Sequence, residues 1–165
     1  MNTYQFGGNA AGKKGETVRV EIATYDDVVL QRVAVATAMA PETRSERFLW
    51  AFRQRLWRLL WLTWILRFAC RWFSGHRPPA ALVTAIRKVR ADGSAENLTG
   101  APVPVEVFDL RSRPVPTPLD ASLAVGDRLV FEILLNRDGQ VHVAAWGISM
   151  KDHLRRLAKT ANFWS

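Results

Sequence analysis

One segment without proline or glycine, running from Arg47 to Phe73, restricts the possible folds of this chain more than any other feature. It holds five of the seven tryptophans, interleaved with six arginines between Arg47 and Arg71. Because nothing in the segment breaks a helix, a long helix is its expected conformation. Tryptophan beside arginine is typical of a surface that meets a lipid interface, a nucleic acid or a partner protein.

Residues at both ends of the segment predict where this helix starts and stops. Thr43 can cap the first turn, with Glu46 three residues later as in a capping box. Gly75, followed by Pro78 and Pro79, ends the helix. We therefore predict a helix over residues 43–74.

Short stretches on either side alternate apolar and polar residues, which indicates half-buried strands. Pro102, just before one of these stretches, and Pro104, within it, favour a sheet edge. The last two stretches flank a turn with glycine, so an antiparallel hairpin is expected there. The proline-rich run 113–118 is expected to form an extended crossing. The candidate strands are Val18–Ile22, Val28–Val35, Leu82–Val89, Val103–Val107, Leu129–Ile133 and Val141–Ala145.

These elements predict an α+β fold. About six strands would form a small antiparallel barrel or sandwich, with the long helix inserted after the second strand. Residues 1–15, which are polar and glycine-containing, are assigned to a flexible N-terminal arm. Residues 16–149 are assigned to a single β domain that contains the inserted helix. Residues 150–165 are assigned to a basic amphipathic helix that starts at Met150 and runs to Ala161.

The positive charge of the chain is concentrated in the helical segment. Residues 42–77 carry eight arginines against two glutamates, a balance of +6, whereas the rest of the chain contributes +2 of the total +8. A lone cysteine, Cys70, excludes an intramolecular disulfide and suits a reducing compartment. The first 16 residues lack the apolar core of a secretory signal, so a cytoplasmic location is expected. Arginine outnumbers lysine 18 to 5, which points to a GC-rich bacterial or phage source.

The arginines do not follow one face along the whole predicted helix. At 100° per residue, Arg47, Arg55 and Arg58 fall within an arc of about 80°. Beyond Leu62 the polar arc moves to nearly the opposite side, where Arg67 and Arg71 lie. The helix is therefore expected either to bend near residues 62–64 or to contact apolar partners on both sides.

A simple transmembrane helix is not expected here. The longest uncharged run, Leu59 to Leu66, would extend about 12 Å, against roughly 30 Å of hydrocarbon in a bilayer. Lying in the interface plane fits better, because tryptophan and leucine can sink below the headgroups while arginine pairs with lipid phosphates. Each arginine near an anionic surface adds about 1 kcal/mol of binding free energy, which weakens with salt.

Three environments remain possible for the tryptophans. The helix could cross the sheet and bury them in the core, it could meet a membrane or a partner, or it could bind single-stranded nucleic acid through stacking and phosphate contacts. Five tryptophans with several leucines exceed what one face of a six-stranded sheet can cover, which favours the second. Self-association through the helix is the commonest form of partner contact.

The sequence contains no convincing catalytic or metal-binding motif. Gly7–Lys14 resembles a phosphate-binding loop but has lysine where the loop needs serine or threonine. The three histidines, His76, His142 and His153, lack ligand spacing. No nucleophile, base and orienting acid can be assembled. We therefore predict no enzymatic activity, no cofactor and no metal.

The expected function is that of a non-enzymatic adaptor or assembly component. Its helix would dock on an anionic membrane surface, at the inner face of the membrane, or into a homo-oligomeric complex. The alternative is a single-stranded nucleic-acid-binding protein with a small β-barrel. The residues predicted to bind the membrane or partner are Trp50, Trp57, Trp61, Trp64, Trp72, Arg47, Arg55, Arg58, Arg67 and Arg71.

Overall fold

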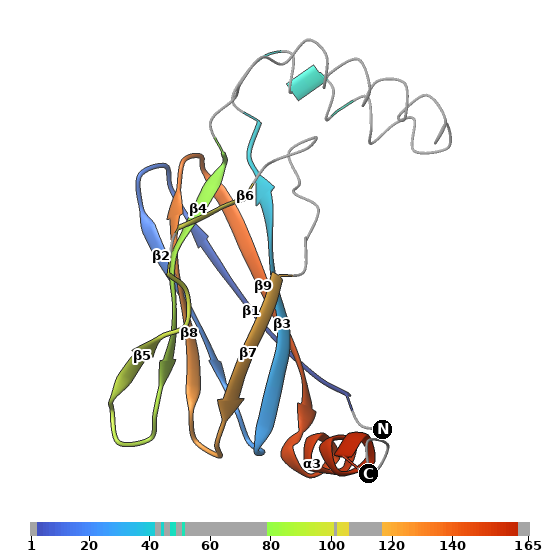
Figure 1. The fold of residues 1–165 in the computed structure, drawn as a ribbon. Coiled ribbons are helices and arrows are strands. Elements are labelled where there is room, and N and C mark those ends of the chain that lie inside the picture. The colour runs from blue at the N-terminus through green and yellow to red at the C-terminus, as the bar shows by residue number, and fades with distance from the viewer. Residues whose placement is uncertain are drawn as a thin grey trace, which may run out of the picture.

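The computed structural model of the chain describes residues 3–41, 79–100, 102–105 and 117–161, together with Arg44, Arg47, Phe48 and Ala51. These residues form a mostly β protein with nine strands in two antiparallel sheets and a C-terminal helix (Figure 1). The four-stranded sheet has the order β1 (Thr3–Gly12), β9 (Gly139–Ser149), β3 (Val28–Met39), β7 (Thr117–Leu123). The five-stranded sheet contains β2 (Thr17–Ala23), β8 (Arg128–Leu135), β4 (Ala81–Val89), β5 (Ala95–Asn97) and β6 (Val103–Val105).

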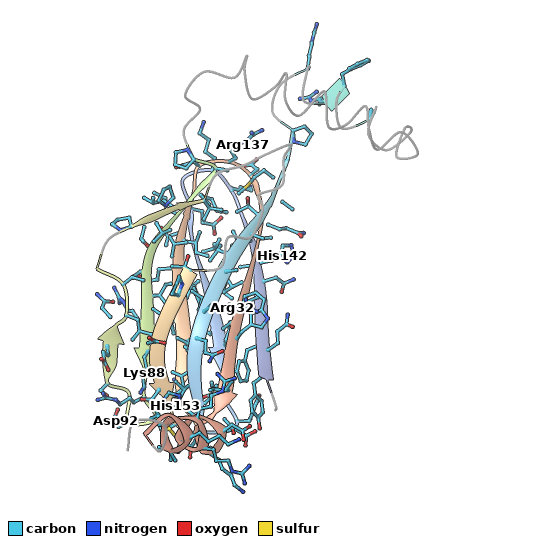
Figure 2. The ribbon with its side chains drawn as sticks, turned by 45° about the vertical axis from the view of Figure 1, so that its right-hand side comes forward. Arg32, Lys88, Asp92, Arg137, His142 and His153 are labelled. Atoms are coloured by element: carbon cyan, nitrogen blue, oxygen red, sulfur yellow. The ribbon has the colours of Figure 1, made fainter. Side chains whose placement is uncertain are left out.

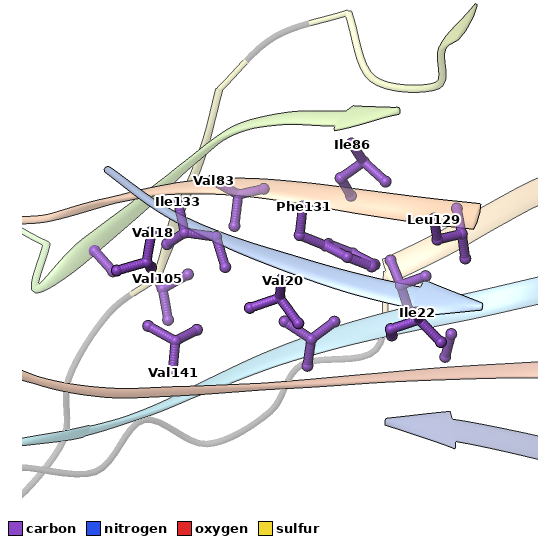
Figure 3. Packing of buried hydrophobic residues seen from close by; sticks show 14 of the residues in the cluster. Val18, Val20, Ile22, Val83, Ile86, Val105, Leu129, Phe131, Ile133 and Val141 are labelled. Atoms are coloured by element: carbon purple, nitrogen blue, oxygen red, sulfur yellow. The ribbon is translucent and has the colours of Figure 1, made fainter. Parts of the chain in front are cut away.

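The two sheets pack face to face and bury one aliphatic core between them. Alternate residues of β2 and β8 point inward, with Phe131 at 0% exposure near the centre (Figure 3). Buried residues of β3 and β9, among them Leu30 and Val143, complete the same cluster from the opposite sheet. Each sheet therefore covers the apolar inner face of the other, as in a sandwich. The described strands do not close into a barrel.

Consecutive strands change sheets at most turns, and this overturns the predicted hairpin. β8 pairs with β2 and β4, whereas β9 pairs with β1 and β3. The turn at residues 136–138 therefore links the two sheets instead of joining two paired neighbours. Alternating hydrophobicity specifies which face of a strand is buried, and both strands do face the same core. It carries no information about which strand is the hydrogen-bonded neighbour.

The predicted flexible arm is wrong for Thr3–Gly12, which forms β1 and pairs with β9 along its length. Gly8 and Gly12 face inward, where β1 crosses over β2. A Cβ at Gly8 would lie 2.7 Å from Val20 Cγ1, and one at Gly12 would lie 2.6 Å from Val18 Cγ1. The glycines are thus required for close packing of the two strands. A glycine-rich sequence suggested a loop because this contact cannot be seen in the local pattern.

The structure corrects the predicted strand number and the predicted crossing, and it confirms one edge strand and the C-terminal helix. Six strands were expected, but the described residues form nine, because the sequence did not indicate β1, β5 and β7. The segment predicted to be a helix follows the third strand and not the second. The extended crossing is wrong at Thr117 and Pro118, which pair with β3, while residues 113–116 lie outside the described part. The edge position of Pro104 is confirmed, because β6 pairs only with β4 among the described strands. The C-terminal helix, α3 (Met150–Ala161), is confirmed with its predicted limits.

Candidate functional site

Nearly all residues predicted to contact a membrane or partner lie outside the described residues. Arg47 is described: it has helical backbone conformation and is exposed, as is Arg44. The others, which lie outside, are Trp50, Trp57, Trp61, Trp64, Trp72, Arg55, Arg58, Arg67 and Arg71. The structure does define where their segment leaves the sandwich and where it returns. We call residues 42–78 the insertion, and residues 40–41 and 79–80 its stems.

Both stems lie at the same end of the sandwich. β3 ends at Met39 in the four-stranded sheet, and β4 begins at Ala81 in the five-stranded sheet (Figure 1). The turn between β8 and β9, residues 136–138, lies at this end between the two stems. The insertion therefore starts and finishes beside one turn.

That turn binds both stems through hydrogen bonds. The amide of Ala40 donates to the carbonyl of Asp138 at 2.8 Å, and the amide of Asn136 donates to the carbonyl of Ala80, also at 2.8 Å. The side-chain amide of Asn136 donates to the carbonyl of Pro79 at 2.7 Å. Asn136 and Asp138, two residues apart, therefore hold both stems at one turn.

Two further contacts brace the same turn. The guanidinium of Arg137 donates to the carbonyl of Ala40 at 3.2 Å. The amide of Lys14, in the turn between β1 and β2, donates to Asp138 Oδ1 at 2.7 Å. The turn that holds the stems is thus itself tied to a neighbouring turn of the sandwich; Figure 2 shows Arg137 at this end of the molecule. The sequence offered a signal here, since Asn and Asp are common in turns, but nothing in it indicated their partners.

The outer face of the five-stranded sheet is charged. Glu21 contacts Arg19 at 2.9 Å and Arg128 at 3.4 Å. Glu132 contacts Arg87 at 3.3 Å. These exposed pairs contribute little to stability but make the face hydrophilic. It offers poor cover for an apolar helix.

The outer face of the four-stranded sheet carries small side chains near its centre. Ala36 on β3 lies opposite His142 on β9, and Ala34 lies opposite Ala144. Farther along the same two strands, the guanidinium carbon of Arg32, labelled in Figure 2, lies 5.0 Å from the centre of the Trp146 ring. This cation–π contact gives Trp146 a role within the sandwich. His142 faces solvent, between the buried Val141 and Val143.

A buried ion pair lies at the end of the sandwich opposite the stems. Lys88 Nζ is 3.3 Å from Asp127 Oδ2, and Asp127 is only 4% exposed. Burial acts to raise the pKa of Asp127, but the amide of Ala124, which donates to Oδ2 at 2.9 Å, and the ammonium of Lys88 together hold this pKa below its usual value. The pair ties the turn before β8 to β4, which is a structural role.

Neither a metal-binding cluster in the described residues nor a comparison with known proteins indicates a function. Among the described residues no three histidine, cysteine, aspartate or glutamate side chains are grouped as metal ligands would be. No helix in the described part is both long and apolar enough to cross a bilayer. The chain matches no protein family model and no curated protein. The functional interpretation therefore rests on the stems, the sandwich and the composition of the insertion.

Proposed function

We propose that this protein is a non-enzymatic adaptor or assembly component whose insertion docks on an anionic membrane surface or into a homo-oligomeric complex. The observation that carries the proposal is the pair of stems fixed by one turn of a sandwich with its own core. The insertion is then an appendage of a folded domain, and its apolar side chains are not needed inside that domain.

The proposal depends on where the apolar surface of the insertion can find cover. Its sequence contains five tryptophans and many leucines. The inner faces of the sheets already cover each other, and the outer face of the five-stranded sheet is occupied by ion pairs. The outer face of the four-stranded sheet offers small alanine side chains beside His142 and Arg32. An apolar surface of this size usually marks a contact with another molecule.

Charge favours a lipid surface as that molecule. The net charge of +6 over residues 42–77 attracts an anionic leaflet, while tryptophan suits the boundary between headgroups and acyl chains. In this arrangement the protein is peripheral to the inner face of the membrane. Self-association through the insertion is the other form of the same proposal, and it has to bring like charges together.

Flotation of the full chain with vesicles tests the proposal. Phosphatidylcholine vesicles with and without about 30% phosphatidylserine are used at low and high salt. We expect flotation with the anionic vesicles, weaker at high salt because screening shortens the range of the charges. Replacing Trp57 and Trp61 by alanine should abolish most of the binding. Trp146→Ala, which removes an indole from the sandwich, is the matched control and should still float.

The other outcomes separate the alternatives. Protein that stays soluble with both lipids and elutes as a defined oligomer indicates the assembly form. A soluble monomer refutes both forms. A salt-dependent shift with a single-stranded oligonucleotide would favour the nucleic-acid alternative, although the described sheets do not provide the closed barrel on which that alternative was based.

A further inference from the structure

α3 begins at a well-defined N-cap at one end of the sandwich. The amide of Asp152 donates to the Ser149 hydroxyl at 3.1 Å, three residues apart as at an N-cap. The amide of Met150 donates to the carbonyl of Asp27, in the turn before β3, at 3.0 Å. α3 contacts β9 and β3, and the half-buried residues Asp152 and His153 belong to its first turn. The first turn is therefore fixed to the domain.

The remainder of the helix carries two leucines that the domain does not cover. Leu154 is 57% exposed and Leu157 is 52% exposed. Their spacing of three residues places both on one side of the helix. Ala158 is exposed beside them. Such an apolar side on a surface helix is normally turned toward a core, and here it is available to a partner.

Basic side chains occupy the neighbouring side of the same helix. Lys151, Arg155 and Lys159 follow one another at spacings of four residues and are all exposed. Arg155 and Lys159 line a shallow hollow with Asp152 and Arg156. Arg155 approaches the Asp152 carboxylate at 3.7 Å, a distance at which an exposed pair is weak. The helix thus carries four basic residues and one acidic residue, with Lys151 and Arg155 nearest to its apolar side.

We propose that α3 is a second membrane-docking element that binds an anionic phospholipid surface. The two leucines enter between the headgroups, and the basic side chains beside them pair with lipid phosphates. A second copy of the chain fits less well, because a symmetric contact would oppose the basic residues of both helices. Two half-exposed leucines also offer little of the roughly 800 Å² per partner that a stable interface buries. Nucleic acid would match the charges but would leave the leucines exposed.

The proposal goes beyond docking by the insertion because α3 lies at the opposite end of the sandwich. α3 is bonded at Asp27, just before β3 begins, whereas the insertion leaves where β3 ends (Figure 1). A strand of this length spans roughly 40 Å. For both elements to touch one leaflet, the long axis of the sandwich must lie along the membrane. The two contacts can nevertheless be measured separately.

Cysteine labelling reports on α3 alone within the full chain. The native thiol, Cys70, lies in the insertion, so Cys70→Ser removes it and Leu157→Cys places a single label on α3. We expect an environment-sensitive fluorophore there to shift to the blue with phosphatidylserine-containing vesicles and not with phosphatidylcholine alone. Ala95→Cys, exposed on β5, is the control label and should not shift. Far-UV circular dichroism checks that each variant is folded.

Charge variants give the expected size of the effect. Adding Arg155→Gln and Lys159→Gln to the α3-labelled protein should weaken its vesicle partition about 25-fold, since each basic residue near an anionic surface is worth about fivefold. An unchanged partition would overturn the anionic-surface proposal. So would a shift that depends on protein concentration without lipid, which would indicate self-association.

Failure of α3 docking can be told apart from failure of docking by the insertion. If the label on native Cys70 shifts with anionic vesicles and the label at 157 does not, the α3 proposal is refuted and the insertion still docks. The reverse pattern supports α3 and refutes membrane docking by the insertion. If neither label shifts, both are refuted.

Discussion

Removing the insertion should leave a folded sandwich. We consider a variant in which residues 42–78 are replaced by a linker of six glycine and serine residues. Ala40 and Ala80 are both hydrogen-bonded to the turn at residues 136–138, so the gap between the stems is short. A six-residue linker reaches up to roughly 20 Å, which is ample for such a gap.

The two interpretations of the insertion predict very different free energies. If it is an appendage, shortening a loop from roughly 37 residues to six lowers the closure cost by about 1.6 kcal/mol, so the variant is at least as stable as the full chain. If its five tryptophans belong to the core, each removal costs about 3 kcal/mol or more, in total about 15 kcal/mol. A domain of this size is stable by only about 5–15 kcal/mol, so the variant would then not fold.

Thermal and urea unfolding followed by far-UV circular dichroism distinguish these outcomes. We expect a β spectrum, one cooperative transition and a Tm no lower than that of the full chain. The same deletion with a 20-residue linker is the control for linker length and should differ only slightly. An insoluble variant, or one without a cooperative transition, would refute the inference that the sandwich core is complete.

Three further substitutions probe the parts of the sandwich that the sequence did not reveal. Gly8→Val should lower the free energy of unfolding by about 1–3 kcal/mol because its Cβ meets the β2 valine, whereas Gly7→Val on the outer face should cost much less; equal effects in urea titrations would contradict this packing. Asp127→Asn should cost about 3 kcal/mol at neutral pH because it leaves the mostly buried Lys88 ammonium without its counter-charge. Because the pKa of Asp127 is lowered in the folded state, its contribution to the free energy of unfolding is complete above about pH 4 and is lost as acid protonates the folded form. The difference in free energy of unfolding between wild type and variant should therefore shrink below that pH. A pH-independent difference would exclude the ion pair as its cause. Asn136→Ala should cost about 1 kcal/mol in the full chain by releasing a stem, and a neutral result would show that its side-chain hydrogen bond is dispensable.

The sequence predicted the elements that carry a strong local signal. β2 and β8 alternate aliphatic and polar residues, and α3 has a basic amphipathic pattern, so both kinds of element are predicted. β1 was missed because its inward positions include Gly8 and Gly12, whose absence of side chain reflects a contact with another strand. Such a contact is invisible in a local pattern.

Strand pairing and the environment of the insertion depend on long-range contacts. The pattern around β8 and β9 fits a hairpin as well as a crossing between sheets, because either arrangement buries the same residues. Hydrogen bonds join the stems to a turn that is far away in the chain, as between Ala40 and Asp138. The concentration of tryptophan and arginine in the insertion is evident from composition.

Quenching of tryptophan fluorescence by lipids brominated on their acyl chains tests most directly whether the insertion is covered from outside. The insertion contributes five of the seven tryptophans, and the variant without residues 42–78 supplies the background from Trp146 and Trp164. We predict strong quenching of the full chain by anionic brominated vesicles and little quenching of the deletion variant. Equal, weak quenching of both, in a full chain that is monomeric and already emits in the blue without lipid, would show that the indoles are buried within the protein's own fold and would contradict the proposal.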